Sequence, residues 1–198
     1  MCRFIETLRS ENGTLCRLSY HQARAERTLR YCLPGTPIPQ LAEAAAALPK
    51  LPGVAKVRII YGAKGVINSS VTPYVPKPVT SLKLIANNTI DYTFKAEDRS
   101  QLQALHARRG LCSDVLIVRN GYLTDTSYAN IALFDGLRWI TPAHPLLCGT
   151  MRQSLLDSGW MTTEELTPAD LPRFTQLTLI NALLPPGIQT LPISAIIS

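Results

Sequence analysis

The sequence has no apolar run that reaches the roughly 20 residues needed to cross a bilayer. Its opening, Met1-Cys2-Arg3-Phe4, lacks the charged start and long apolar stretch of a secretion signal. Charged residues make up only 17% of the chain and hydrophobic residues 46%, which argues against disorder and supplies enough apolar material for a core. We therefore expect a folded cytoplasmic protein that spans no membrane, with 198 residues in one large domain or two small ones.

Paired cysteines are also missing. The chain has five cysteines, an odd number, and none of them forms a CxxC motif. Reduced thiols explain this pattern better than a disulfide framework or a zinc site. The three histidines do not lie at metal-ligand spacing from the cysteines, so we expect no metal.

Runs of lysine are absent, although the net charge is +6. Of the 20 basic residues, 14 are arginine, and they are scattered along the chain. A nucleic-acid surface is one interpretation of a basic protein, but dispersed charge of this size is more typical of an ordinary solvated surface. We expect no nucleic-acid partner, and several arginines remain as candidates for an anionic ligand.

The pattern of strands, turns and helices predicts an α+β fold with two sheet-containing lobes. Asn12-Gly13 and Asn120-Gly121 are hairpin turn signals between apolar runs. Three prolines within residues 73–78 suggest a boundary, so we expect lobes at 1–78 and 79–198. The predicted strands are 3–9, 15–18, 54–61, 66–71, 81–85, 114–119, 122–125, 130–134, 137–140 and 176–181, and the predicted helices are 21–31, 41–48, 97–109 and 150–159.

Three places could carry chemistry. Gly149-Thr150 opens a predicted helix, where unpaired N–H groups can bind an anion, although threonine is also a common helix cap. Asp125 lies in an otherwise apolar region and would need a cationic partner to stay ionised there, although acidic residues also form turns. Lys95 is one of only six lysines and a candidate amine nucleophile, although a lysine after an aromatic residue is more often on the surface.

The order of these pieces along the chain resembles the class IV, or fold-type IV, pyridoxal-phosphate enzymes. That family includes branched-chain aminotransferases, D-amino-acid aminotransferases and 4-amino-4-deoxychorismate lyases. The matching segments are 4–9, Asn12-Gly13, 21–24, Lys95 with Arg99, 123–125, Asn130, 139–142, 147–152 and 180–185. The resemblance covers nearly the whole chain and implies the D-amino-acid aminotransferase-like fold, with a shortened N-terminal lobe.

The resemblance assigns roles to individual residues. Lys95 would be the Schiff-base lysine and general acid/base, and Asp125, where the family usually has glutamate, would pair with the cofactor's ring nitrogen. Substrate carboxylates would need cationic partners, for which Arg58 and Arg99 are candidates alongside a plain surface role. The remaining cofactor-binding positions that the resemblance implies are Arg24, Asn130, Gly149, Thr150, Asn181 and Ala182.

Two features favour the lyase within this family. Thr7 falls where the lyases carry a threonine implicated in proton transfer, and Asn181-Ala182-Leu183 is similar to the lyase tail. The lyase would convert 4-amino-4-deoxychorismate to 4-aminobenzoate and pyruvate, a step of folate biosynthesis. An aminotransferase of branched-chain or D-amino acids is the alternative, and a cofactor-free binding protein is a third. The resemblance also implies a homodimer that acts on a small carboxylate substrate.

Overall fold

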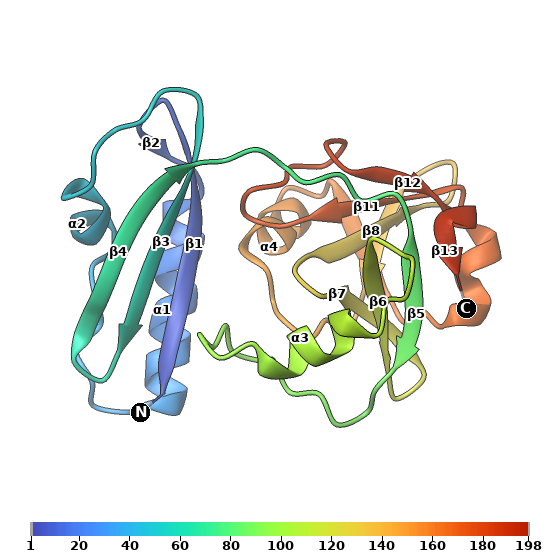
Figure 1. The fold of residues 1–198 in the computed structure, drawn as a ribbon, viewed down its shortest axis with the longest axis horizontal. Coiled ribbons are helices and arrows are strands. Elements are labelled where there is room, and N and C mark those ends of the chain that lie inside the picture. Colours follow the sequence, from blue (N-terminus) through green and yellow to red (C-terminus); the bar gives the residue numbers. More distant parts are fainter. Residues whose placement is uncertain (1, 198) are drawn as a thin grey trace. The chain divides into compact units, whose positions relative to one another are not determined.

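The computed structural model describes residues 2–197, and the chain in it forms two compact units. Unit 1 comprises Met1–Pro76 and Phe94–Asp98, and unit 2 comprises Lys77–Thr93 and Arg99–Ser198. Figure 1 shows both units, each built around β-sheet with few helices. The predicted α+β class is confirmed. No helix in residues 2–197 is long and apolar enough to span a bilayer.

Unit 1 is one antiparallel sheet of order β2-β1-β3-β4 with two helices. The alternation of β1 turns Phe4, Glu6 and Leu8 inward, and α1 packs against them with Ala25 and Leu29. The core of unit 1 therefore lies between α1 and one face of this sheet. Its elements are β1 (Arg3–Glu11), β2 (Thr14–Leu15), α1 (Leu18–Cys32), α2 (Leu41–Ala46), β3 (Val54–Gly62) and β4 (Gly65–Pro73).

Unit 2 contains a five-stranded sheet, β10-β9-β8-β11-β12, and a four-stranded sheet, β13-β5-β6-β7. Leu116 of β6, Leu133 of β8 and Leu179 of β11 belong to one buried cluster, so the two sheets share a core. The strands are β5 (Leu82–Ala86), β6 (Asp114–Arg119), β7 (Tyr122–Thr126), β8 (Asn130–Phe134), β9 (Trp139–Pro142), β10 (Met161–Glu164), β11 (Gln176–Ile180), β12 (Thr190–Pro192) and β13 (Ile196–Ile197).

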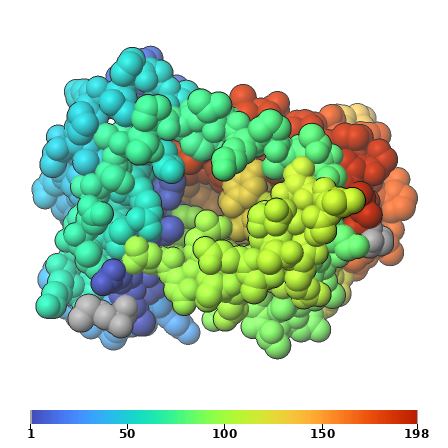
Figure 2. Space-filling model, in the orientation of Figure 1, coloured from blue at the N-terminus to red at the C-terminus, as the bar shows by residue number. Residues whose placement is uncertain are grey.

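The helices of unit 2 are short. α3 (Ser100–Ala107) buries Leu102 and Leu105, and its polar side is exposed at the surface, where the space-filling view shows it in yellow-green (Figure 2). α4 (Thr150–Asp157) follows Gly149, as predicted. Two short 3-10 helices, η1 (Pro168–Arg173) and η2 (Ile193–Ala195), complete the unit.

Several predicted boundaries were wrong. The return strand 15–18 is only Thr14–Leu15, because Leu18 already begins α1. The helix predicted at 97–109 starts at Ser100, because the segment before it pairs with β1: Ile5 N–H donates to the carbonyl of Lys95 at 2.9 Å, and Ala96 forms a bridge with Phe4. This pairing places Phe94–Asp98 in unit 1. The chain therefore crosses between the units more than once, whereas the expected lobes, 1–78 and 79–198, had a single boundary.

Candidate functional site

Lys95, Thr7 and Arg58 lie on the same face of the unit 1 sheet. Thr7 is directly opposite Arg58 in the β1–β3 register, and Lys95 pairs beside Ile5, two residues from Thr7. Phe94 turns to the other face, where its ring meets that of Tyr31 on α1 at 5.0 Å between centroids. The backbone of unit 1 thus brings together three residues that lie far apart in the sequence.

Arg58 forms an ion pair with the carboxylate of Glu97 on this face. One of its terminal nitrogens donates to Oε1 of Glu97 at 3.2 Å, and both side chains are about one-third exposed or less. Arg3 approaches the other oxygen of Glu97 at 3.5 Å. The ion pair with Glu97 therefore orients the Arg58 guanidinium and leaves it accessible to solvent, as a carboxylate-binding residue needs to be.

Arg24 lies on the other face of the sheet, in a buried cluster. Its Nε donates to Oε1 of Glu6 at 2.8 Å and its Nη2 to Oε2 at 2.5 Å, while His21 Nδ1 lies 2.5 Å from the same Oε2. Burial would raise the pKa of Glu6, but Arg24 and His21 outweigh it and lower the pKa to about 2. Burial lowers the pKa of His21, and the bond to Glu6 opposes that shift. The phosphate role of Arg24 stays a prediction, and the partner observed in unit 1 is Glu6.

In unit 2, the side chains of Asp125 and Asn130 and the backbone of Leu147 are joined by three hydrogen bonds. Asn130 Nδ2 donates to Oδ1 of Asp125 at 2.8 Å and to the carbonyl of Leu147 at 2.9 Å. The N–H of Leu147 donates to Oδ2 of Asp125 at 2.9 Å. The strand ends that carry Asp125 and Asn130 are thereby tied to the segment that leads into α4.

The carboxyl group of Asp125 has an unusual environment. Burial raises its pKa to about 6, against the lowering effects of the Leu147 N–H, Asn130 and the charge of Arg152. Within residues 2–197 its hydrogen-bond donors are neutral groups, which stabilise a carboxylate less than an ionic partner does. A cation placed against this carboxylate would complete the site.

Gly149 and Thr150 form the buried start of α4. The first turn of an α-helix has N–H groups with no partner inside the helix, and they favour an anion. Arg152, in the first turn of α4, adds positive charge here. Its side chain is 95% buried, and its Nε has no hydrogen-bond partner among residues 2–197, so it has a donor left for a ligand. The arrangement in unit 2 is therefore suited to a ligand with an anionic group and a cationic ring.

The last two predicted cofactor residues lie in a tight turn after β11. Asn181 Oδ1 accepts the N–H groups of Leu183 and Leu184 at 2.8 and 3.0 Å, and its Nδ2 donates to the carbonyl of Tyr128 at 3.4 Å. Ala182 is half-buried within this turn. The observed contacts of Asn181 are thus with the chain's own backbone.

Comparisons with known proteins show the family to which the chain belongs. The family model described as "Amino-transferase class IV" matches residues 3–196. An uncharacterised protein of Haemophilus influenzae is 33% identical over 190 residues, covering 92% of this chain and 98% of its own length. The chain belongs to the class IV aminotransferase family.

Two solved structures extend the comparison. A Haemophilus somnus protein with the provisional name 4-amino-4-deoxychorismate lyase is 30% identical, with a TM-score of 0.85 over 92% of this chain and 97% of that one. The PLP-bound form of a hypothetical aminotransferase from Mycobacterium tuberculosis is 20% identical and shares the fold, with a TM-score of 0.77 over 98% of this chain and 81% of that one.

This class IV protein is therefore a pyridoxal-phosphate-dependent enzyme, and the predicted family, fold and cofactor are confirmed. Its residues fit the cofactor. In the part of the chain that the structure describes, the buried carboxyl of Asp125 has no ionic hydrogen-bond partner and so suits a protonated ring nitrogen, and the start of α4 suits a phosphate. The family finding favours an enzyme over the cofactor-free binding protein.

Two residues of these clusters were missed as functional from the sequence. Glu6 could have been found, because a charge between Phe4 and Leu8 falls on the buried side of the strand's alternation and needs a cation nearby. Arg152 was seen only as part of a motif, and nothing local indicated that its side chain would be buried beside Asp125.

Gly149→Ala should destabilise the class IV fold locally. An added Cβ at this position would lie 2.0 Å from Oδ1 of Asn130, so the buried amide would have to move and weaken its bonds to Asp125 and Leu147. We expect a loss of about 1–3 kcal/mol in the free energy of unfolding, measured by urea denaturation. In an Asn130→Ala background the same change should cost clearly less, and equal costs in both backgrounds would contradict the clash.

Asp125→Asn should change how stability depends on pH. The folded pKa of about 6 is above the ordinary 3.8, so the stability contributed by Asp125 is fully present below pH 3.8 and is lost as the pH rises through 6. Asparagine does not titrate. Measured by urea denaturation of cofactor-free protein, the stability of the variant relative to wild type should rise by about 2–3 kcal/mol between pH 4 and pH 8.

The variant also loses one hydrogen bond, because the amide N–H₂ of asparagine cannot accept it. This loss lowers the stability of the variant by the same amount at every pH, so only the change of the stability difference with pH is diagnostic. An Asp157→Asn variant, changed at an exposed position on α4, should track wild type across the range. If the Asp125→Asn difference does not vary with pH, Asp125 is not the buried titrating group described here.

Proposed function

We propose that this class IV enzyme is a lyase that converts 4-amino-4-deoxychorismate to 4-aminobenzoate and pyruvate, a step of folate biosynthesis. The observation that carries the proposal is the shared face of unit 1, where Lys95 and Thr7 lie on the same side of the sheet with Arg58. A lyase of this kind needs an amine, a second proton carrier and a carboxylate-binding cation. The similarity to the provisionally named Haemophilus somnus lyase supports the same choice.

In this proposal the Nζ of Lys95 would hold the cofactor, and the same amine would move protons at the substrate carbon. Thr7 assists proton delivery through its hydroxyl group. Arg58 orients a substrate carboxylate, and the planar guanidinium suits that task. Pyruvate leaves as the substrate ring becomes aromatic.

The remaining roles belong to cofactor binding. When bound, pyridoxal phosphate supplies an electron sink conjugated to the substrate amine. Asp125 would hold the ring nitrogen with its carboxyl group, and the hydrogen bond from Asn130 would orient Asp125. Gly149 and Thr150 would give backbone N–H groups to the phosphate, and Arg24 would give its guanidinium.

An aminotransferase of branched-chain or D-amino acids is the second candidate. It stays a candidate because the side chain of Asn181 is hydrogen-bonded to the backbone of Leu183, Leu184 and Tyr128, which does not favour one activity over the other. The tail that resembles the lyase therefore has a turn-forming role that either enzyme could use.

We also propose a homodimer, for which light scattering should give twice the 21.8 kDa chain mass.

The experiment that separates the candidates measures two products. Purified enzyme with pyridoxal phosphate is given 4-amino-4-deoxychorismate, and pyruvate and 4-aminobenzoate are quantified. In parallel, L- and D-amino acids are tested with 2-oxoglutarate for amino transfer. Equal amounts of pyruvate and 4-aminobenzoate support the lyase, whereas amino transfer without 4-aminobenzoate would overturn it in favour of the aminotransferase.

A further inference from the structure

The turn Thr126–Ala129 joins Asp125 at the end of β7 to Asn130 at the start of β8. Within the turn, the Thr126 N–H donates to the Ala129 carbonyl at 2.8 Å, and Thr126 Oγ1 accepts the Ala129 N–H at 3.1 Å. The conformation of this turn determines how Asp125 and Asn130 face each other, since they flank it.

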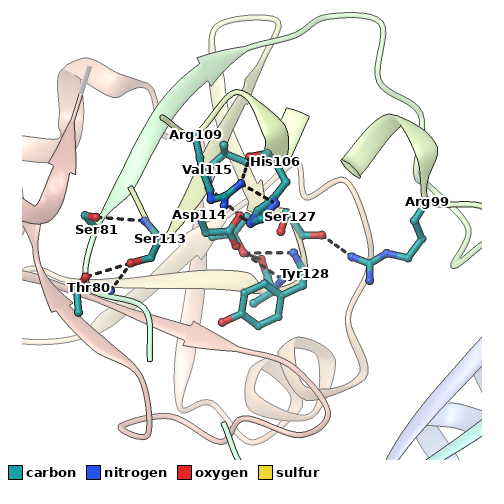
Figure 3. A network of polar contacts seen from close by, with 12 residues as sticks. Thr80, Ser81, Arg99, His106, Arg109, Ser113, Asp114, Val115, Ser127 and Tyr128 are labelled. Atoms are coloured by element: carbon teal, nitrogen blue, oxygen red, sulfur yellow. Dashed lines mark hydrogen bonds and ion pairs between the residues drawn. The ribbon is translucent and has the colours of Figure 1, made fainter. Parts of the chain in front are cut away.

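Two distant residues hold successive carbonyl groups of this turn. Arg99 Nη2 donates to the carbonyl of Ser127 at 2.7 Å, and Asn181 Nδ2 donates to the carbonyl of Tyr128 at 3.4 Å. Figure 3 shows the guanidinium of Arg99 pointing at Ser127. A bond from a charged donor is stronger than one between neutral groups, so Arg99 is the firmer anchor.

The carboxyl group of Asp114, at the start of β6, lies near Ser127. Asp114 is 1% exposed, and its Oδ1 accepts the N–H of Val115 at 2.8 Å. Burial raises the pKa of Asp114, and hydrogen bonds from Val115 and Ser127 oppose that shift. Asp114 and Arg99 are both drawn with Ser127 in Figure 3. The hydrogen bonds that hold the turn from outside it thus come from two segments, one before α3 and one after β11.

We propose that Arg99 and Asn181 are positioning residues that fix the Thr126–Ala129 turn and so orient Asp125 and Asn130 for cofactor binding. The proposal rests on the proposed function only for the cofactor role of Asp125. It gives Arg99 a role through the turn instead of direct contact with a substrate carboxylate. It also explains why the Asn181 amide is directed to a backbone carbonyl.

Direct substrate binding by Arg99 is the competing role. The Nε of Arg99 is buried and has no hydrogen-bond partner in the described part of the chain, so one donor is left over. The two roles differ in what a substitution changes. Loss of a substrate contact raises KM and leaves the cofactor-free turn unaltered, whereas loss of an anchor loosens the turn before any ligand is added.

The test is hydrogen–deuterium exchange of the cofactor-free protein, with Arg99→Met compared with Arg108→Met. Arg108 is exposed just after α3, so the control removes the same charge without touching the turn. We expect backbone amide exchange of Tyr128 and Ala129 to rise about tenfold or more in Arg99→Met and to stay at the wild-type rate in Arg108→Met. The dissociation constant for pyridoxal phosphate should rise about tenfold, with kcat lowered and KM changed less than about twofold.

Asn181→Asp provides a second variant. It keeps the oxygen that accepts the Leu183 and Leu184 N–H groups but replaces the donor to Tyr128 by an acceptor, so the same turn amides should exchange faster. If Arg99→Met does not fold, Arg99→Lys is used in its place. Unchanged turn exchange in the Arg99 variant, with or without a raised KM, would overturn the proposal. A loosened turn in an enzyme that forms no 4-aminobenzoate would instead reject the lyase and leave the positioning role standing.

Discussion

Lys95→Ala is expected to eliminate covalent attachment of pyridoxal phosphate and to lower the rate of the reaction by about 10²–10⁴-fold. The reason is that the amine has two tasks, holding the cofactor and moving protons at the substrate carbon. The pairing beside β1 fixes the backbone of Lys95 through the Ile5 N–H, so the substitution removes the side chain without disturbing its support. The measurement is borohydride reduction of the loaded enzyme, followed by mass analysis of the peptide that contains residue 95.

Wild type should carry one reduced pyridoxyl group on the Lys95 peptide, and Lys95→Ala should carry none. Lys64→Ala is the matched control, since Lys64 is an exposed lysine of unit 1 at the β3–β4 turn, and it should behave like wild type. A labelled peptide elsewhere in the Lys95→Ala protein, with activity retained, would show that another lysine carries the cofactor.

Features encoded by local chemistry were predicted well from the sequence. Asn12 and Gly13 both have positive φ, 50° and 85°, as the turn between the first two strands requires. The helix expected at 97–109 was wrong at its start, because residues before Ser100 pair with a strand some ninety positions away in the sequence. The strand β10 was missed for a similar reason, since it exists through parallel pairing with β9. Pairing between distant segments leaves little trace in either sequence.

The candidate site shows the same division. Lys95, Asp125 and Gly149 were predicted as site residues because their order and spacing match a family, even though each was ambiguous alone, and their roles stay predictions. The contacts of Arg99 with the Ser127 carbonyl and of Asn181 with the Tyr128 carbonyl depend on the tertiary fold. A backbone carbonyl looks the same at every position of a sequence, so no motif could have indicated these partners.

Glu6→Gln is expected to destabilise the protein by about 3–5 kcal/mol at pH 7, measured by urea denaturation. Glu6 is fully buried and accepts two hydrogen bonds from Arg24 and one contact from His21. The neutral amide leaves the Arg24 charge uncompensated in the core and turns an amide N–H₂ toward donors. Glu11→Gln is the control, because the Arg9–Glu11 pair is largely exposed on its acidic side and should contribute under about 1 kcal/mol.

The dependence on pH separates this ion pair from a simple packing effect. The folded pKa of Glu6 is about 2, below its ordinary 4.5, so its stabilising contribution is present above pH 4.5 and is lost as the pH falls toward 2. The stability gap between wild type and Glu6→Gln should therefore be largest at pH 6–7 and shrink steadily below pH 4.5. A gap that stays constant down to pH 3 would mean that the carboxylate charge is not what holds Arg24, and that the cluster stabilises unit 1 through shape alone.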